Sequence, residues 1–233
     1  MNKKTVLLVL LSVAFANLLK AQLVEFGVQA SVFGSRFTVS ENRLSDDILV
    51  RQGRIAPGGT IGALIEYGAP KDQPRSYLKL YSSLLAEFNF AYNPGNIELM
   101  YTTADGTNYF NELSYTLMQS ELSFKYLGKL KRFRFLGGPS FVYNAYRGVQ
   151  LANGEMRNAG SQITPYYINF EFGIGVRANK FMVSTRYTTN ITDFGKESPL
   201  IPTTFNSHQI RFVVDIYLME KHRGKNWGSI YWD

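Results

Sequence analysis

The stretch YYINFEFGIGVR, residues 166–177, decides the fold class of this chain. Every second residue of the stretch is apolar or aromatic, and the residues between them include an amide, an acid, a base and two glycines. Because side chains in a strand alternate between two faces, this pattern predicts one long strand with an apolar face and a polar face. A strand in a soluble sheet is about five or six residues long, so the length itself needs an explanation.

Seven further segments alternate in the same way, and no segment of comparable length has helical periodicity with caps. The predicted strands cover residues 23–33, 58–67, 76–92, 111–126, 132–146, 166–178, 180–192 and 207–218. Their connections alternate between short ones (68–75, 127–131 and a turn at Asn179) and long ones (34–57, 93–110, 147–163 and 193–206). An even number of strands with short turns at one end and long loops at the other is typical of transmembrane β-barrels.

One long connection contains a further strand pattern. Residues 97–103 alternate again, and Asp105-Gly106 favours a tight turn. We therefore expect the third and fourth strands to continue past the membrane as a hairpin, with a β-bulge at Asn93-Pro94-Gly95.

Alternation does not say which face points outward, since an eight-stranded soluble barrel of the lipocalin kind is apolar inside. Here the polar faces carry as many acids as bases, and buried charges must be paired. The interior network is expected to contain Glu25, Glu66, Lys79, Glu87, Glu121, Lys125, Arg134, Glu171, Arg177, Arg186, Arg211 and Asp215. Glycines on the same faces relieve crowding inside a narrow barrel: Gly27, Gly62, Gly173 and Gly175. Aromatic residues near the strand ends of the apolar faces suit two interfacial girdles: Tyr67, Phe90, Tyr126, Phe133, Tyr143, Tyr166 and Phe181.

These features predict an all-β fold: a closed, eight-stranded, antiparallel up-and-down transmembrane barrel with a polar, filled interior. A tilted strand needs about 9–11 residues to cross the hydrocarbon, which explains the length of the opening stretch. An unpaired strand edge in lipid costs several kcal/mol per group, so the barrel must close.

The ends of the chain predict export. Residues 1–21 combine a basic start with an apolar run of about fifteen residues, which indicates a signal peptide; a spanning helix needs about 20. We expect the barrel at residues 22–218 and a periplasmic tail at 219–233, in the outer membrane of a Gram-negative bacterium with both termini periplasmic. The net charge is +7, and removing Lys3, Lys4 and Lys20 lowers it by three to +4, with no basic patch that would favour nucleic acid.

Few residues could carry chemistry. With no Cys and two His, the sequence predicts no metal site and no cofactor. Ser207 and His208 are neighbours, but strand parity places His208 on the apolar side, so a lipid-modifying enzyme is the least favoured function. A small channel lined by the interior charges is the first alternative to structural packing. The mixed-charge loop 36–54 (Glu41, Arg43, Asp46, Asp47, Arg51) is expected to be either a solvated loop or a partner contact. In the tail, Trp227, Tyr231 and Trp232 are expected either to anchor at the membrane interface or to bind a partner, with partner binding favoured.

Four segments resemble the PorT-type family of small outer-membrane barrels: GGTIGALIEYG (58–68), SELSFKYLGK (120–129), FLGGPSFVY (135–143) and FEFGIGVRANKFMVSTRYTTNITDF (170–194). The resemblance implies a non-enzymatic accessory or structural component of an outer-membrane complex. If it extends to the role of the founding member, the chain would serve protein secretion of the type IX kind. The tail departs from the family pattern, which ends near the eighth strand.

Overall fold

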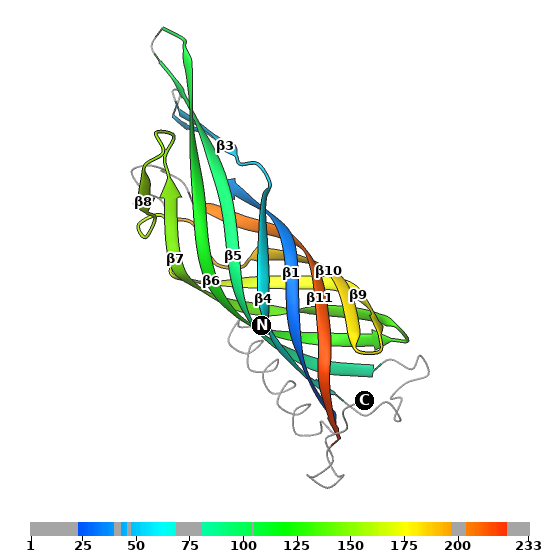
Figure 1. The fold of residues 1–233 in the computed structure, drawn as a ribbon. Helices are drawn as coiled ribbons and strands as arrows, with labels where there is room; N and C mark the ends of the chain where they lie inside the picture. The colour runs from blue at the N-terminus through cyan, green and yellow to red at the C-terminus, as the bar shows by residue number, and fades with distance from the viewer. Residues whose placement is uncertain are drawn as a thin grey trace, which may run out of the picture.

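The computed structural model describes residues 23–39, 43–45, 48–68, 81–103, 105–196 and 204–222, and it contains eleven strands within these ranges (Figure 1). They are β1 (Leu23–Val39), β2 (Arg43–Ser45), β3 (Ile48–Gln52), β4 (Ala56–Gly68), β5 (Tyr81–Thr102), β6 (Asn108–Leu130), β7 (Phe133–Gln150), β8 (Met156–Asn158), β9 (Tyr166–Ala178), β10 (Phe181–Asn190) and β11 (Phe205–His222). Among these residues no helix is long and apolar enough to span a membrane.

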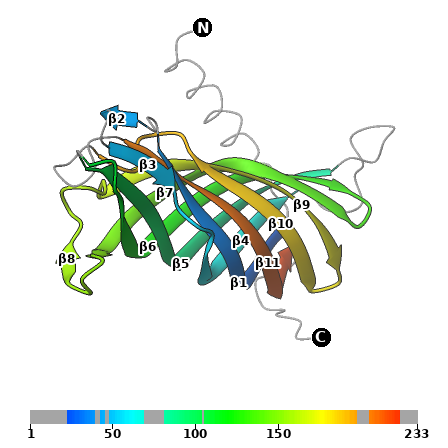
Figure 2. The same ribbon diagram turned by 90° about the horizontal axis from the view of Figure 1, so that it is seen from above.

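Eight of the strands form a closed antiparallel ring. Following the hydrogen bonds around the wall gives β1, β4, β5, β6, β7, β9, β10 and β11, and β11 pairs again with β1 (Figure 2). The prediction of an eight-stranded, up-and-down closed barrel is confirmed. Each wall strand has two neighbours, so the barrel wall has no open edge. The long connections lie at one end, called the long-loop end, and the tight turns after β6 and β9 lie at the other, called the turn end.

The last strand is longer than predicted. It was expected to end at Leu218, but β11 continues to His222 because β1 pairs with it as far as Leu23. Residues 219–222 therefore belong to the barrel wall, and 223–233 lie outside the described residues, as do the predicted signal peptide and Lys79.

The predicted hairpin extension is confirmed, but the predicted bulge is wrong. β5 and β6 pair without a register shift from Tyr81 and Lys129 to Thr102 and Asn108. Asp105-Gly106 forms the turn, with Gly106 at φ +80°. Gly95 serves a different purpose from a bulge: the ring of Phe37 occupies the space that a Cβ at this position would fill.

The connection 34–57, predicted as one long loop, contributes two strands to a sheet outside the wall. β2 pairs with β3, and β3 pairs with β5 from Gln52–Ile97 to Ile48–Tyr101. We call this sheet, made of β2, β3 and residues 97–113 of the β5–β6 hairpin, the blade. In Figure 1 it projects beyond the rest of the barrel.

The two faces of the wall have opposite polarity. Large apolar side chains point outward and are exposed, for example Val32 at 66% and Tyr166 at 70%. The predicted girdle residues all lie on this outer face, with Tyr67 half-buried and the other six exposed. Acids, bases and amides fill much of the interior. A water-soluble barrel has the reverse arrangement, so the lipocalin alternative does not describe this chain.

Candidate functional site

The middle of the barrel contains a buried cluster of charges, which we call the central charge network. It consists of four acids and three bases on five strands: Glu87 on β5, Glu121 and Lys125 on β6, Glu171 on β9, Arg186 on β10, and Arg211 and Asp215 on β11. Each of them is at most 4% exposed. Charges buried to this degree are tolerated only when they are paired and hydrogen-bonded.

Arg186 lies at the centre of this network. Its Nη1 donates to Glu87 Oε1 at 2.8 Å and to Glu171 Oε1 at 3.3 Å. Its Nη2 donates to Asp215 Oδ2 at 2.9 Å. Gly173 on β9 makes room for its stem, because a Cβ there would lie 2.8 Å from Arg186 Cγ. One guanidinium therefore connects three acids from three strands, and the glycine beside it is required by space.

Two further bases complete the network. Lys125 Nζ lies 2.5 Å from Glu87 Oε2 and also pairs with Glu171. Arg211 donates to both oxygens of Glu121 at 2.7 Å, which is a bidentate pair. Such fork-to-fork pairs are among the strongest hydrogen bonds in proteins. Lys125 thus pairs with two acids, Glu87 and Glu171, whereas Arg211 forms close hydrogen bonds with Glu121 alone.

The network holds one more carboxylate than cation. Asp215 contacts a single cationic side chain, Arg186, which it shares with two other acids. Its other oxygen accepts from Gln29 Nε2 at 2.7 Å, and the same amide donates to Glu87 at 3.0 Å. Asp215 is therefore the least compensated acid of the network.

A second group of charges lies nearer the turn end. Arg177 donates to Glu25 with both terminal nitrogens, at 2.7 and 2.5 Å. Lys129 pairs with Glu66, which also accepts from the Tyr217 hydroxyl at 2.8 Å. The sequence reasoning missed Lys129 because the fourth strand was expected to end at Tyr126. The inward parity of Lys125 continues to Lys129 and was the signal that could have found it.

Arg134 lies beside the second group of charges but forms no ion pair with them. It is 9% exposed and donates through Nη1 to the carbonyl oxygens of Lys131 and Phe133, while its Nε has no hydrogen-bond partner. No ion pair joins Arg134 to an acid within the described residues. Of the twelve charges expected inside, the structure thus places ten in the two paired groups and Arg134 beside them.

The long-loop end of the interior is apolar, which the sequence reasoning did not foresee. Five aromatic side chains pack there, at most 3% exposed, and we call them the aromatic cluster: Phe37, Tyr115, Tyr167, Phe194 and Phe205. Ring centroids of Phe37 and Phe194 lie 5.1 Å apart, and those of Tyr167 and Phe194 lie 5.0 Å apart. Aliphatic residues extend the cluster: Ile97, Leu99, Leu113, Leu117, Val142, Val149, Ala159 and Ile163. The interior is therefore filled by two layers of different chemistry.

Part of the aromatic cluster comes from connections that fold inward. Arg147 donates to the carbonyl oxygens of Gly160 and Ile163, at 3.3 and 2.8 Å. The Tyr115 hydroxyl donates to Gln162 at 2.5 Å. These contacts hold the end of the β7–β9 connection against the barrel, with Ile163 fully buried. The sequence signal was a change of polarity: Leu113, Tyr115 and Leu117 share the inward parity of Glu121 and Lys125, whereas Ser114 and Thr116 take the outward positions.

Ser207 and His208 do not form a catalytic pair. Ser207 faces the interior, where its hydroxyl lies 3.4 Å from that of Ser35. His208 lies on the outer side, with Nδ1 2.7 Å from the Tyr187 hydroxyl and 3.2 Å from that of Thr189. A serine nucleophile needs its base within hydrogen-bond reach and an acid to orient that base. Neither condition is met in this arrangement.

Other predicted sites fall outside the described residues. Trp227, Tyr231 and Trp232 belong to 223–233, and Glu41, Asp46 and Asp47 lie in the gaps around β2. Arg43 and Arg51 are placed in β2 and β3 of the blade. Within the described ranges, no group of three or more His, Asp or Glu residues could hold a metal ion.

The fold and interior define a class: a closed eight-stranded barrel, apolar outside and charged inside. Among solved structures, the attachment invasion locus protein Ail of Yersinia pestis, in complex with sucrose octasulfate, is similar over 83% of this chain and 98% of its own, with 8% identity and a TM-score of 0.44. Neisserial surface protein A is similar over 82% and 96%, with 13% identity and a TM-score of 0.43. At these scores the similarities carry no argument about what the chain does.

No family model matches the sequence, and no curated protein matches it. The resemblance to the PorT-type family therefore stays a prediction.

Proposed function

We propose that this chain is a non-enzymatic outer-membrane β-barrel that acts as a structural or accessory component of an outer-membrane complex. The observation that carries the proposal is a closed wall with an apolar exterior around an interior filled by the central charge network and the aromatic cluster. Exposed Ile, Phe and Val side chains around a whole barrel are stable in hydrocarbon and unfavourable in water.

The filled interior favours anchoring over transport. Eight-stranded barrels are just wide enough for side chains to fill, and here two layers fill the cross-section in succession. The surfaces left for function are those beyond the wall: the blade at the long-loop end and the tail that follows β11. Of the two alternatives, the geometry supports neither a channel nor a Ser207–His208 enzyme.

The blade is the better-defined surface for a protein partner. Tyr109 and Phe110 near the end of its hairpin are 59% and 61% exposed. Aromatic side chains are common anchors at protein interfaces. The sequence of the tail offers a second candidate through Trp227, Tyr231 and Trp232. A role in protein secretion of the type IX kind rests on the PorT-type resemblance alone.

Two experiments test the proposal. Purified protein refolded with lipid vesicles is expected to insert and to migrate differently on gels before and after heating; a chain that stays in the aqueous fraction would refute the membrane assignment. Mild-detergent purification from native membranes is then expected to retain a stoichiometric partner. A matched pair of variants locates it: one replaces the exposed Tyr109 and Phe110 of the blade with serine, which leaves the buried residues of the hairpin in place, and the other lacks residues 226–233. A partner that is still retained by a third variant, which combines both changes, would contradict both surfaces.

A further inference from the structure

The two tight turns at the turn end carry the same short pattern. In the β6–β7 turn, Lys131 at φ +54° is followed by Arg132 and then by Phe133, the first residue of β7. In the β9–β10 turn, residues 179–181 repeat the pattern as Asn-Lys-Phe, and the asparagine has φ +51°. Each turn therefore places a base directly before an outward aromatic ring, and the first turn carries a second base.

The two turns lie side by side. The backbone N–H of Arg177, at the end of β9, donates to the carbonyl oxygen of Arg132 at 2.8 Å. Lys131, Arg132 and Lys180 are all exposed, and we call these three residues the basic rim. The hydrogen bonds that Arg134 donates to two backbone carbonyl oxygens hold the β6–β7 turn in place from inside. The bases of the rim thus belong to one surface with a fixed backbone.

The interior of the turn end does not neutralise the rim. Among the side chains that the structure describes at this end, the acids are Glu25 and Glu66, and both are buried and already paired. Three bases lie with them inside the barrel: Lys129, Arg134 and Arg177. The described part of the turn end therefore carries a net positive charge, to which the rim and the interior both contribute.

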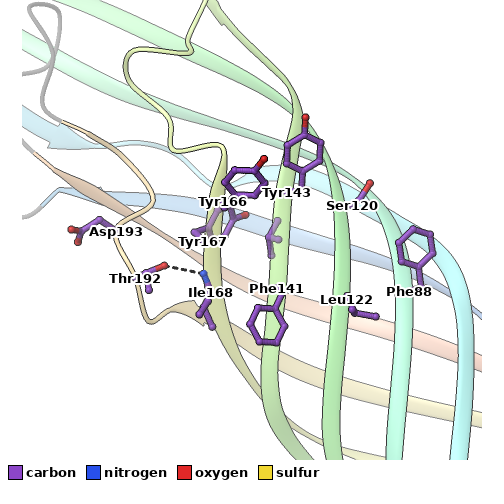
Figure 3. Close-up of a pocket in the computed structure, with 11 residues that line it drawn as sticks. Phe88, Ser120, Leu122, Phe141, Tyr143, Tyr166, Tyr167, Ile168, Thr192 and Asp193 are labelled. Atoms are coloured by element: carbon purple, nitrogen blue, oxygen red, sulfur yellow. Dashed lines mark hydrogen bonds between the residues drawn. The ribbon is translucent and has the colours of Figure 1, made fainter. Parts of the chain in front are cut away.

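The outer aromatic residues at the other end of the barrel have different neighbours. Figure 3 shows the stacked rings of Tyr143 and Tyr166, whose centroids lie 5.2 Å apart. The residues drawn around this stack include one acid, Asp193, and no base. The pairing of bases with outward aromatic rings in both tight turns is thus not repeated at this stack.

We propose that the basic rim binds the head groups of anionic phospholipids in the leaflet at the turn end. The inference rests on the proposed membrane location, in which Phe133 and Phe181, 57% and 55% exposed on the outer wall, contact lipid. One residue of a strand advances about 3.3 Å. Arg132 and Lys180, each one residue beyond these rings, therefore lie at the level of the lipid head groups, where basic side chains attract anionic lipid. This depth favours a lipid over a free anion as the occupant.

Spin-labelled lipids test the proposal on the refolded protein in phosphatidylcholine vesicles. Electron paramagnetic resonance compares how strongly spin-labelled phosphatidylglycerol and spin-labelled phosphatidylcholine associate with the barrel. The unmodified protein is expected to prefer phosphatidylglycerol, and the preference should fall as salt is raised, because exposed charges are screened. Lys131→Asn combined with Arg132→Gln should lower the preference about fivefold. The asparagine suits the turn, because Asn179 has nearly the same φ in the other turn.

The matched control removes the same charge from the long-loop end. Arg157→Gln combined with Lys196→Gln replaces one arginine and one lysine at exposed positions of the long connections and is expected to keep the preference. Migration on gels before and after heating shows that each variant still forms the closed barrel. A preference that is unchanged in the Lys131 and Arg132 variant, or equally lowered in both double variants, would overturn the proposal.

Further outcomes separate the possible occupants of the rim. No preference for phosphatidylglycerol at low salt in the unmodified protein would also overturn the proposal. Displacement of phosphatidylglycerol by sodium phosphate, but not by sodium chloride of the same ionic strength, would assign the rim to a free anion. Loss of a co-purifying protein from the Lys131 and Arg132 variant, with its lipid preference unchanged, would assign the rim to an acidic protein partner. A barrel that inserts without any lipid preference defeats this inference alone, whereas a chain that does not insert defeats the proposed function.

Discussion

Individual side chains inside the barrel differ in how much they depend on one another. Glu121 and Arg211 form a two-hydrogen-bond pair at 2.7 Å, and the next acid contacts Arg211 only at 3.9 Å. Asp215 instead shares one guanidinium with two other acids in a network that already has an excess carboxylate. Neutralising Asp215 should therefore change the free energy of unfolding less than neutralising Glu121.

We expect Asp215→Asn to change the free energy of unfolding by about 1 kcal/mol, because the variant loses the hydrogen bond from Gln29 but keeps an amide oxygen that accepts from Arg186, and the excess negative charge disappears. Glu121→Gln should cost about 3–5 kcal/mol, since it leaves the buried Arg211 without a close carboxylate. Urea unfolding of the refolded barrel in vesicles measures both. An Asp215 variant as unstable as the Glu121 variant would contradict the assigned imbalance.

The inward side chains were largely predictable at this scale, and the reason is parity. Once one residue of a strand is known to face inward, every second residue does until a register shift interrupts the strand, as at Ala145 of β7. The alternating stretch of β9 alone predicts that Glu171 and Arg177 point inward. Parity does not reveal partners: the sharing of Arg186 by three acids depends on the stagger of β5, β9 and β11, which no single strand encodes.

Among the elements, the β5–β6 hairpin is the one most specified by local sequence. At its tip Asp105 accepts hydrogen bonds from the Thr103 hydroxyl and from the Thr107 backbone N–H, the latter at 3.1 Å. These two donors, the hydroxyl above all, lower the pKa of Asp105 below its ordinary value. The turn therefore gains stability from the ionised carboxylate above the ordinary aspartate pKa, and loses it as the pH falls through the lower folded value.

We expect Thr103→Val to raise the pKa of Asp105 towards its ordinary value, because the variant removes the hydroxyl donor and keeps the shape of the side chain. An NMR titration of the Asp105 carboxyl carbon in both proteins measures the midpoints. Identical midpoints would show that the hydroxyl does not hold this turn.

Other elements were beyond sequence reasoning. β2, with three residues, and β3, with five, are too short to show a periodic pattern, and they pair only because β5 extends past the end of β4. The same holds for β8, which pairs with the end of β7. These short strands form because a longer neighbouring strand offers unpaired backbone hydrogen-bonding groups, and their own residues carry no strand pattern.

The whole molecule combines two fillings that stabilise it by different means. The central charge network supplies ion pairs, and the aromatic cluster supplies apolar packing across Phe37, Phe194 and Phe205. The outer wall follows from alternation, so the closed barrel could be predicted. The aromatic cluster could not, because Phe194 and Ile163 come from connections whose inward folding depends on the completed ring.

Because the interior has two layers, removing part of one layer tests whether the other still closes the barrel to ions. Phe37→Ala removes a fully buried ring from the aromatic cluster and should lower the free energy of unfolding by about 3–5 kcal/mol. It should nevertheless leave the barrel non-conducting in planar bilayers, because Arg186, Lys125 and their acids still fill the cross-section below. The unmodified protein should also show no steady conductance. Stable single-channel steps in the unmodified protein would reverse the assignment to a closed anchor, and steps that arise only in the variant would show that the aromatic cluster alone seals the barrel.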